Sequence, residues 1–223
     1  MLYQFGFVCC LTLAMGLRGW GQTVEPVTPA PGPTPALVGP GDWKYSPNDG
    51  EPYAPLSVKH KAYVFGWRSI APSSWIKSAL AAGLAQYQNS PEEWEQGTRG
   101  FGMRYGHRMA NRGVESAIGF GVAAALRQDP RYFRKPNAGI KARMGNAFSQ
   151  AVVTHTDSGA KTFAAWRVAG SYGAQFVSNA WRPESERGVG DTMVRGTLSI
   201  GYDATANLFK EFWPDIKRRV FKK

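Results

Sequence analysis

The segment RGFGMRYGHRMANRGVESAIGFGVAAAL, residues 99–126, decides how the chain folds. Small residues recur in it every three or four positions, the spacing that places side chains on one face of an α-helix. They are Gly102, Gly106, Ala110, Gly113, Ala117, Gly121 and Ala125. Glycine inside a helix costs about 0.5–1 kcal/mol relative to alanine, so several in register require a compensating gain, usually the close approach of two helix backbones. The stripe therefore predicts helices that pack through small residues.

The remainder of the chain also has helical patterns. Ser90, Pro91 and Glu93 form a capping box, which predicts that the long helix starts there and ends before the Asp129–Pro130 pair. Further helices are expected over 73–88, 138–153, 160–180 and from about 189 to Pro214, which breaks or kinks the last one. These patterns predict an all-α bundle of about five helices. A glycine zipper inserted into a membrane is the alternative, and the charges in each helix argue against it.

Two segments precede the predicted bundle. The apolar run from Phe5 to Leu17 indicates a signal peptide over residues 1–21, with an uncleaved anchor as the alternative. Residues 22–55 contain nine prolines, which predicts a disordered tether before a helical domain over 56–223. Cys9 and Cys10 both lie in the leader, so a mature chain would have no disulfide, thiolate nucleophile or cysteine metal site. We expect an exported protein of the periplasm or cell envelope, and peripheral binding to a membrane is one form that this location can take.

The net charge is +11, and it is concentrated in two places. Ten Lys or Arg residues lie between Arg99 and Arg143, and six lie between Leu208 and Lys223. Such a balance favours anionic partners, and export makes nucleic acid an improbable one. Anionic lipid headgroups or an envelope polymer are the expected partners; a solvated basic surface that only keeps the protein soluble is the alternative.

Arg104, Arg108 and Arg112 lie roughly opposite the small-residue stripe. If the stripe faces other helices, these arginines face outward and can bind phosphate or carboxylate with paired hydrogen bonds. The alternative is that they pair with aspartates of other helices, for which the candidates are Asp157, Asp191 and Asp203.

The C-terminal segment combines apolar and basic residues. Phe209, Phe212, Trp213, Ile216 and Val220 recur at helical spacing, and a cluster of cations follows Pro214: Lys217, Arg218, Arg219, Lys222 and Lys223. This combination is typical of a helix that lies on an anionic membrane surface. Alternatively, Phe209, Phe212 and Trp213 dock on the bundle and a charged tail stays in water.

Four phrases bear on family membership: PEEWEQG (91–97), DPRYFR (129–134), HTDSGAKTF (155–163) and KEFWPDIKRR (210–219). Together they resemble an uncharacterised exported bacterial family without an assigned activity. The resemblance implies a single exported helical domain and carries over no functional residue.

The sequence contains no motif that specifies a chemistry. His60, His107 and His155 stand apart without metal-ligand spacing, and we predict no metal, cofactor or catalytic residue. We therefore expect a non-catalytic envelope protein, a possible homo- or hetero-oligomer, that binds or organises an anionic surface. Its alternatives are an envelope hydrolase that uses a pair among Asp129, Asp157, Asp191 and Asp203, and a structural subunit of a larger assembly.

Overall fold

The protein is described by a computed structural model that covers residues 47–48 and 53–220. The predicted signal peptide, most of the predicted tether, Lys222 and Lys223 lie outside these residues. The helices are α1 (Val58–Ile70), α2 (Pro72–Tyr87), η2 (Glu92–Trp94), α3 (Gly97–Ala125), α4 (Ile140–Ser149), α5 (Ala165–Ser178), η3 (Glu184–Glu186) and α6 (Val189–Val220). A small sheet contains β1 (Gln128–Asp129), β2 (Val153–Thr156) and β3 (Lys161–Phe163).

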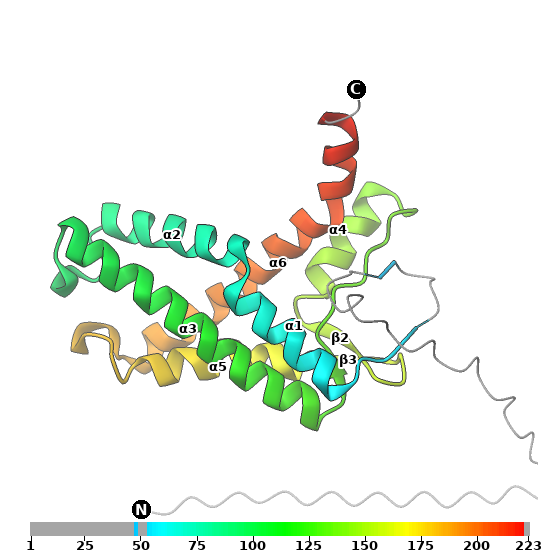
Figure 1. The fold of residues 1–223 in the computed structure, drawn as a ribbon, viewed down its shortest axis with the longest axis horizontal. Coiled ribbons are helices and arrows are strands. Elements are labelled where there is room, and N and C mark those ends of the chain that lie inside the picture. The colour runs from blue at the N-terminus through cyan, green and yellow to red at the C-terminus, as the bar shows by residue number, and fades with distance from the viewer. Residues whose placement is uncertain (1–46, 49–52, 221–223) are drawn as a thin grey trace, which may run out of the picture. The chain divides into compact units, whose positions relative to one another are not determined.

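The expected helical fold is confirmed, with six α-helices in the described residues (Figure 1). Helix α3 is central, since it packs against α1, α2 and α5, while α6 packs against α5 and α4. The sheet was not expected; its three short strands are antiparallel in the order β1-β2-β3. Its strands belong to the segment between α3 and α5. The turn at Asp157–Gly159 reverses the chain, so that β3 pairs with β2.

Three local predictions were wrong at helix starts. The helix expected over 160–180 begins only at Ala165, because Lys161–Phe163 form strand β3. Helix α3 begins at Gly97 and not at Ser90, because the chain turns through η2 and through Glu95, whose φ of 55° is not helical. Helix α1 was missed; Ser57 caps it by accepting from the backbone N–H of His60. Pro214 lies inside α6, and Figure 1 shows the C-terminal part of this helix turning away from its earlier axis.

The interior of the helical body is mostly polar. The largest fully buried side chains are Arg104, Lys61, Glu211, Asn207, Thr192, Asp129, Ser171 and Ser178. An apolar cluster does exist where α1, α3 and α5 meet, around Phe65, Ala123 and Trp166. Most other large apolar side chains are exposed, which reverses the usual arrangement of a globular domain.

Helix α5 illustrates this reversal. Its sequence pattern separates an apolar face from Arg167, Ser171 and Gln175, yet these three polar residues are buried. Phe176 and Val177, on the apolar face, are exposed, whereas Trp166 at the start of the same face is buried in the apolar cluster. Helix α2 behaves in the same way: it buries small residues such as Ser78 and Ala82 and exposes its large ones, which are Trp75, Ile76, Leu80, Leu84 and Tyr87.

The small-residue stripe of α3 corrects our prediction about helix packing. Every stripe residue is exposed: Gly102, Gly106, Ala110, Gly113, Ala117, Gly121 and Ala125. An added Cβ at Gly102, Gly106, Gly113 or Gly121 would have no neighbouring atom within 4 Å. Within the described chain, the stripe therefore lies on the outer surface and packs no helices together.

Close helix packing is provided by other glycines. A Cβ at Gly119 would lie 2.9 Å from the Phe65 ring, and one at Gly170 would lie 3.0 Å from the carbonyl oxygen of Glu115. At Gly196 it would enter the ring of Tyr172. The idea that small residues allow close approach is therefore right for the inner faces of α3, α5 and α6, whereas the regular stripe is on the opposite face of α3.

Candidate functional site

The three predicted arginines of α3 have different environments: Arg104 is buried, Arg112 is partly buried, and Arg108 is exposed where it lines a cavity. Arg104 is buried, donates from Nε to the carbonyl oxygen of Ser90 at 3.0 Å, and donates from Nη2 to that of Pro91 at 2.7 Å. Its Nη1 donates to the carbonyl oxygen of Glu95 at 2.7 Å and to Gln86 Oε1 at 2.6 Å. Arg104 therefore holds the chain between α2 and α3 in place and has no remaining role at an anionic surface.

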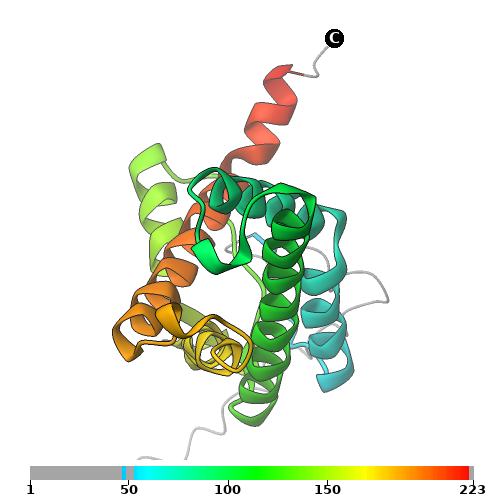
Figure 2. The same cartoon turned by 90° about the vertical axis from the view of Figure 1, so that its left-hand side faces the viewer.

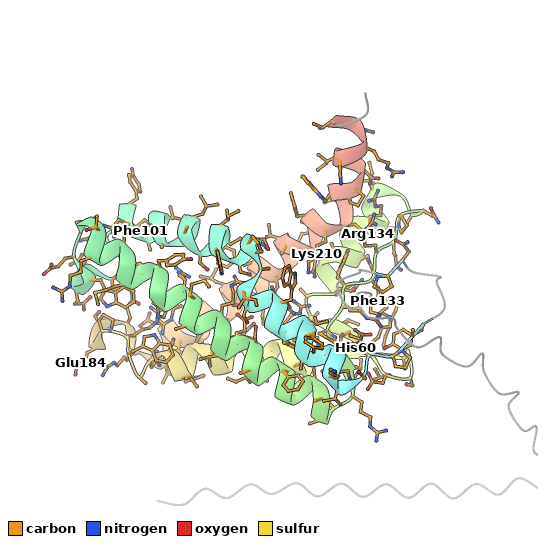
Figure 3. All side chains as sticks on the ribbon, in the orientation of Figure 1. His60, Phe101, Phe133, Arg134, Glu184 and Lys210 are labelled. Carbon is orange, nitrogen blue, oxygen red and sulfur yellow. The ribbon has the colours of Figure 1, made fainter. Side chains whose placement is uncertain are left out.

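Arg108 lies one turn further along α3 and lines a cavity of about 370 Å³. Residues of α2, α3, α5, the segment around η3 and the first half of α6 line this cavity. Figure 2 looks onto the end of the helical body where α3, α5 and α6 surround this region. In Figure 3 the same end carries the labelled Phe101 on α3 and Glu184 on η3. We call this space the arginine cavity, after Arg104, Arg108, Arg182 and Arg195 in its lining.

The arginine cavity contains more cations than anions. Its acidic lining residues are Glu186, which forms an ion pair with Arg182, and Asp191. Arg195 donates to Asn179 Oδ1 at 3.0 Å and to Thr192 Oγ1 at 3.1 Å, so its hydrogen-bond acceptors are neutral, although the charges of Glu186 and Asp191 also act on it. Reduced hydration, together with the nearby charge of Arg195, lowers the pKa of Arg182 to about 10. The cavity is therefore a positively charged environment.

Arg112 lies outside that cavity. It borders a smaller space together with Arg68, Glu115, Arg167 and Asp203. Asp203 accepts from Arg167 at 2.5 Å and lies 3.7 Å from Arg68, and these cations keep its pKa near 2 despite burial, which acts to raise it. Burial raises the pKa of Glu115, and Asp203 raises it further. The group is a partly buried charge network between α1, α3, α5 and α6.

The predicted pairing of arginines with aspartates is only partly found. Asp203 does receive arginines, but these are Arg167 and Arg68 rather than those predicted. Asp157 pairs with Lys61 at 2.8 Å, and Asp129 pairs with Arg131 at 2.6 Å. Each of these three carboxylates thus has a structural cation, whereas Asp191 is the candidate aspartate that lines the arginine cavity.

The C-terminal part of α6 exposes both halves of the predicted pattern. Phe209 is 59% exposed, Trp213 42%, Ile216 44% and Val220 67%. Phe212 instead packs beneath the Arg143 guanidinium, 4.4 Å from ring centroid to Cζ. Lys217, Arg218 and Arg219 are exposed, and Arg218 pairs with Asp215. Phe212 therefore docks on the bundle, whereas Phe209 and Trp213 stay at the surface. We call the exposed residues the C-terminal surface; they are Phe209, Trp213, Ile216, Lys217, Arg218, Arg219 and Val220.

Buried contacts hold the base of this surface in place. Glu211 accepts from Tyr132 Oη at 2.6 Å, from the backbone N–H of Lys135 at 3.0 Å and from Arg143 Nε at 3.1 Å. Arg143 also pairs with Asp215 at 2.6 Å. Because Glu211 and Asp215 flank Pro214, the bend in α6 is tied to α4 and to the chain before it.

Sequence reasoning missed most of the arginine cavity. Arg182 and Arg195 are separated from α3 by long stretches of sequence, and His107 was considered only as an isolated histidine. Among residues 47–48 and 53–220, no three His, Cys, Asp or Glu side chains gather as a metal site requires. Over the same residues, no helix combines the length and hydropathy needed to cross a membrane.

Comparison with known proteins gives no match to a family model, a curated protein or a solved structure.

Proposed function

We propose that the protein is an exported, non-catalytic protein of the cell envelope that binds anionic lipid headgroups through its C-terminal surface. The observation that carries this proposal is the exposure of Phe209, Trp213, Ile216 and Val220 on the same helix as Lys217, Arg218 and Arg219. Large apolar side chains at the level of a bilayer interface gain burial, and neighbouring cations gain attraction to anionic headgroups.

Position on the helix supports this assignment. At 100° per residue, Phe209, Trp213, Ile216 and Val220 lie within an arc of about 60°, which is the geometry of an interfacial helix. The cations follow the last buried anchor, Glu211, so they can reach headgroups without disturbing the packed part of α6. The proposed export depends on the predicted leader, which lies outside the described residues.

Vesicle co-sedimentation tests the proposal. Each cation near an anionic surface contributes about 1 kcal/mol, so K217Q/R218Q/R219Q should weaken binding to phosphatidylglycerol vesicles by roughly 100-fold. The control K59Q/R99Q/K161Q removes three other exposed cations and should bind nearly as the parent does. Ile216→Gln with Val220→Gln should also weaken binding, because it removes the inserted side chains.

Two results would overturn lipid binding. Equal binding to neutral and anionic vesicles by the parent and both triple variants would remove the role of the cations. Binding to an isolated anionic envelope polymer but not to vesicles would reassign the C-terminal surface to that polymer.

A second candidate function is a subunit of a larger assembly, and the outer face of α2 favours it. Ile76, Leu80 and Tyr87 are 62%, 71% and 89% exposed and lie on one side of this helix. Contiguous exposed apolar side chains usually mark an interaction surface. Sedimentation velocity of the parent and of Ile76→Gln with Leu80→Gln tests this role: assembly predicts a larger species that the variant dissociates, and a monomeric parent excludes self-assembly.

A further inference from the structure

The arginine cavity has two chemically different walls. One wall is formed by the guanidinium groups of Arg108 on α3, Arg182 between α5 and α6, and Arg195 near the start of α6. The other wall is apolar. Val194 and Leu198 line the cavity while remaining 59% and 53% exposed, so their side chains contact its open space. Tyr202, 67% exposed, continues the same side of α6. A volume of about 370 Å³ is within the range of small-molecule sites.

The cationic wall has donors without acceptors. Within the described residues, Arg108 forms no hydrogen bond or ion pair at the distances these interactions require, although it is open to the cavity. The Nε groups of Arg182 and Arg195 are buried and also lack an acceptor. Buried donors are normally satisfied. The Nε groups of Arg112, Arg134 and Arg167 elsewhere in the described residues also lack an acceptor, so it is the open space beside the cavity's donors that points to an acceptor supplied from outside the chain.

His107 adds to this excess of donors. Trp181 Nε1 donates to His107 Nδ1 at 2.9 Å, while Arg182 Nη2 lies 2.6 Å from Nε2. A neutral imidazole has one acceptor nitrogen, and both neighbours are donors, so only one of them can be satisfied by the ring. Reduced hydration and the charge of Arg182 lower the pKa of His107 to about 3, which keeps the ring neutral. An incoming oxyanion would accept from the donor that the ring cannot satisfy.

We propose that the arginine cavity binds a small amphiphilic anion, whose carboxylate or phosphate accepts from Arg108, Arg182 and Arg195 and whose apolar body lies on Val194 and Leu198. Guanidinium groups hold such oxyanions with paired, charge-assisted hydrogen bonds. The apolar wall gains by the removal of its exposed surface from water. This site is separate from the C-terminal surface and does not depend on the proposed membrane function.

Isothermal titration calorimetry with four probes tests the ligand class. Octanoate and octyl phosphate carry both parts, inorganic phosphate carries only the anion, and octanol carries only the apolar body. We expect octanoate or octyl phosphate to bind at least tenfold more tightly than inorganic phosphate or octanol. Equal affinity for octyl phosphate and inorganic phosphate would overturn the role of the apolar wall, and equal affinity for octanol would overturn the role of the arginines.

Variants locate the site. Arg108→Gln should weaken binding of the preferred probe at least tenfold, and because Arg108 forms no hydrogen bond or ion pair within the described residues, folding should be little affected. Arg99→Gln removes an exposed arginine of the same helix outside the cavity lining and should bind as the parent does. Leu198→Ser should weaken the amphiphile but not inorganic phosphate. Unchanged affinity in Arg108→Gln, with far-UV circular dichroism equal to the parent's, would overturn the proposal. Retained binding in K217Q/R218Q/R219Q would separate this site from the C-terminal surface.

Discussion

Alanine substitutions at the glycines of α3 should change the free energy of unfolding in opposite directions on its two faces. At Gly106 and Gly113 a new Cβ has no atom within 4 Å, so the substitution changes only helix propensity. Each should stabilise the protein by about 0.5–1 kcal/mol. At Gly100 the Cβ would meet the carbonyl oxygen of Glu95 and lie 2.6 Å from that of Trp94. Both are backbone atoms, and Arg104 holds the Glu95 oxygen in place, so relieving such a clash costs typically 1–3 kcal/mol.

Urea unfolding followed by far-UV circular dichroism measures this difference. The free energy of unfolding should rise for Gly106→Ala and Gly113→Ala and fall for Gly100→Ala, which separates the two kinds of variant by about 1.5–4 kcal/mol. Gly106 and Gly113 are about 10 Å apart along the helix, so the double variant should show nearly additive gains. If Gly106→Ala and Gly113→Ala destabilise as much as Gly100→Ala does, the stripe packs against another helix and the orientation of α3 described here is wrong.

Two further predictions concern the buried polar groups. Arg104→Met should destabilise the protein by about 2–4 kcal/mol, because it leaves three carbonyl oxygens around η2 without their donor; Arg108→Gln is the matched control in thermal unfolding and should be within about 0.5 kcal/mol of the parent. An equal loss in both variants would contradict the different roles given to these neighbours. His107 predicts a pH dependence: between its ordinary pKa of 6.5 and its folded pKa of about 3, the unfolded chain binds a proton that the folded chain does not. Stability should therefore fall as the pH drops from 6.5 toward 3, by up to about 1.4 kcal/mol per pH unit, and His107→Gln should remove this part of the slope in urea titrations at several pH values. A slope unchanged by the substitution would show that His107 is protonated in the folded protein.

The sequence predicted the helices better than it predicted their orientation. Periodicity located α2 and most of α5 because it identifies two different faces on each helix. It does not state which face is inside, and apolar burial is the usual assumption. In α3 and α5 that assumption fails, since Arg104 and Arg167 find their acceptors on other segments of the chain. No local pattern shows that Asp203, far along the sequence, will meet Arg167 and Arg68.

The same reason explains what was missed at the candidate site. Arg108 was selected as an arginine without an acidic residue in reach on its own helix, and it is exposed, but the cavity that it lines was not predicted. Arg182 and Arg195 join it only through the packing of α5 and α6 against α3. The C-terminal surface was better predicted, because its apolar spacing and its cations lie within a few turns of one helix.

The most direct test of the reversed arrangement is thiol accessibility along α3. With Cys9→Ser and Cys10→Ser as background, Ala110→Cys and Ala117→Cys place a thiol on the exposed stripe, and Ala123→Cys places one at a residue with 0% exposure. In the folded protein in vesicle-free buffer, a maleimide should modify positions 110 and 117 at rates close to those in urea and should modify position 123 only after unfolding. Protection at 110 and 117 together with rapid modification at 123 would mean that the small residues face inward and the arginines face the solvent.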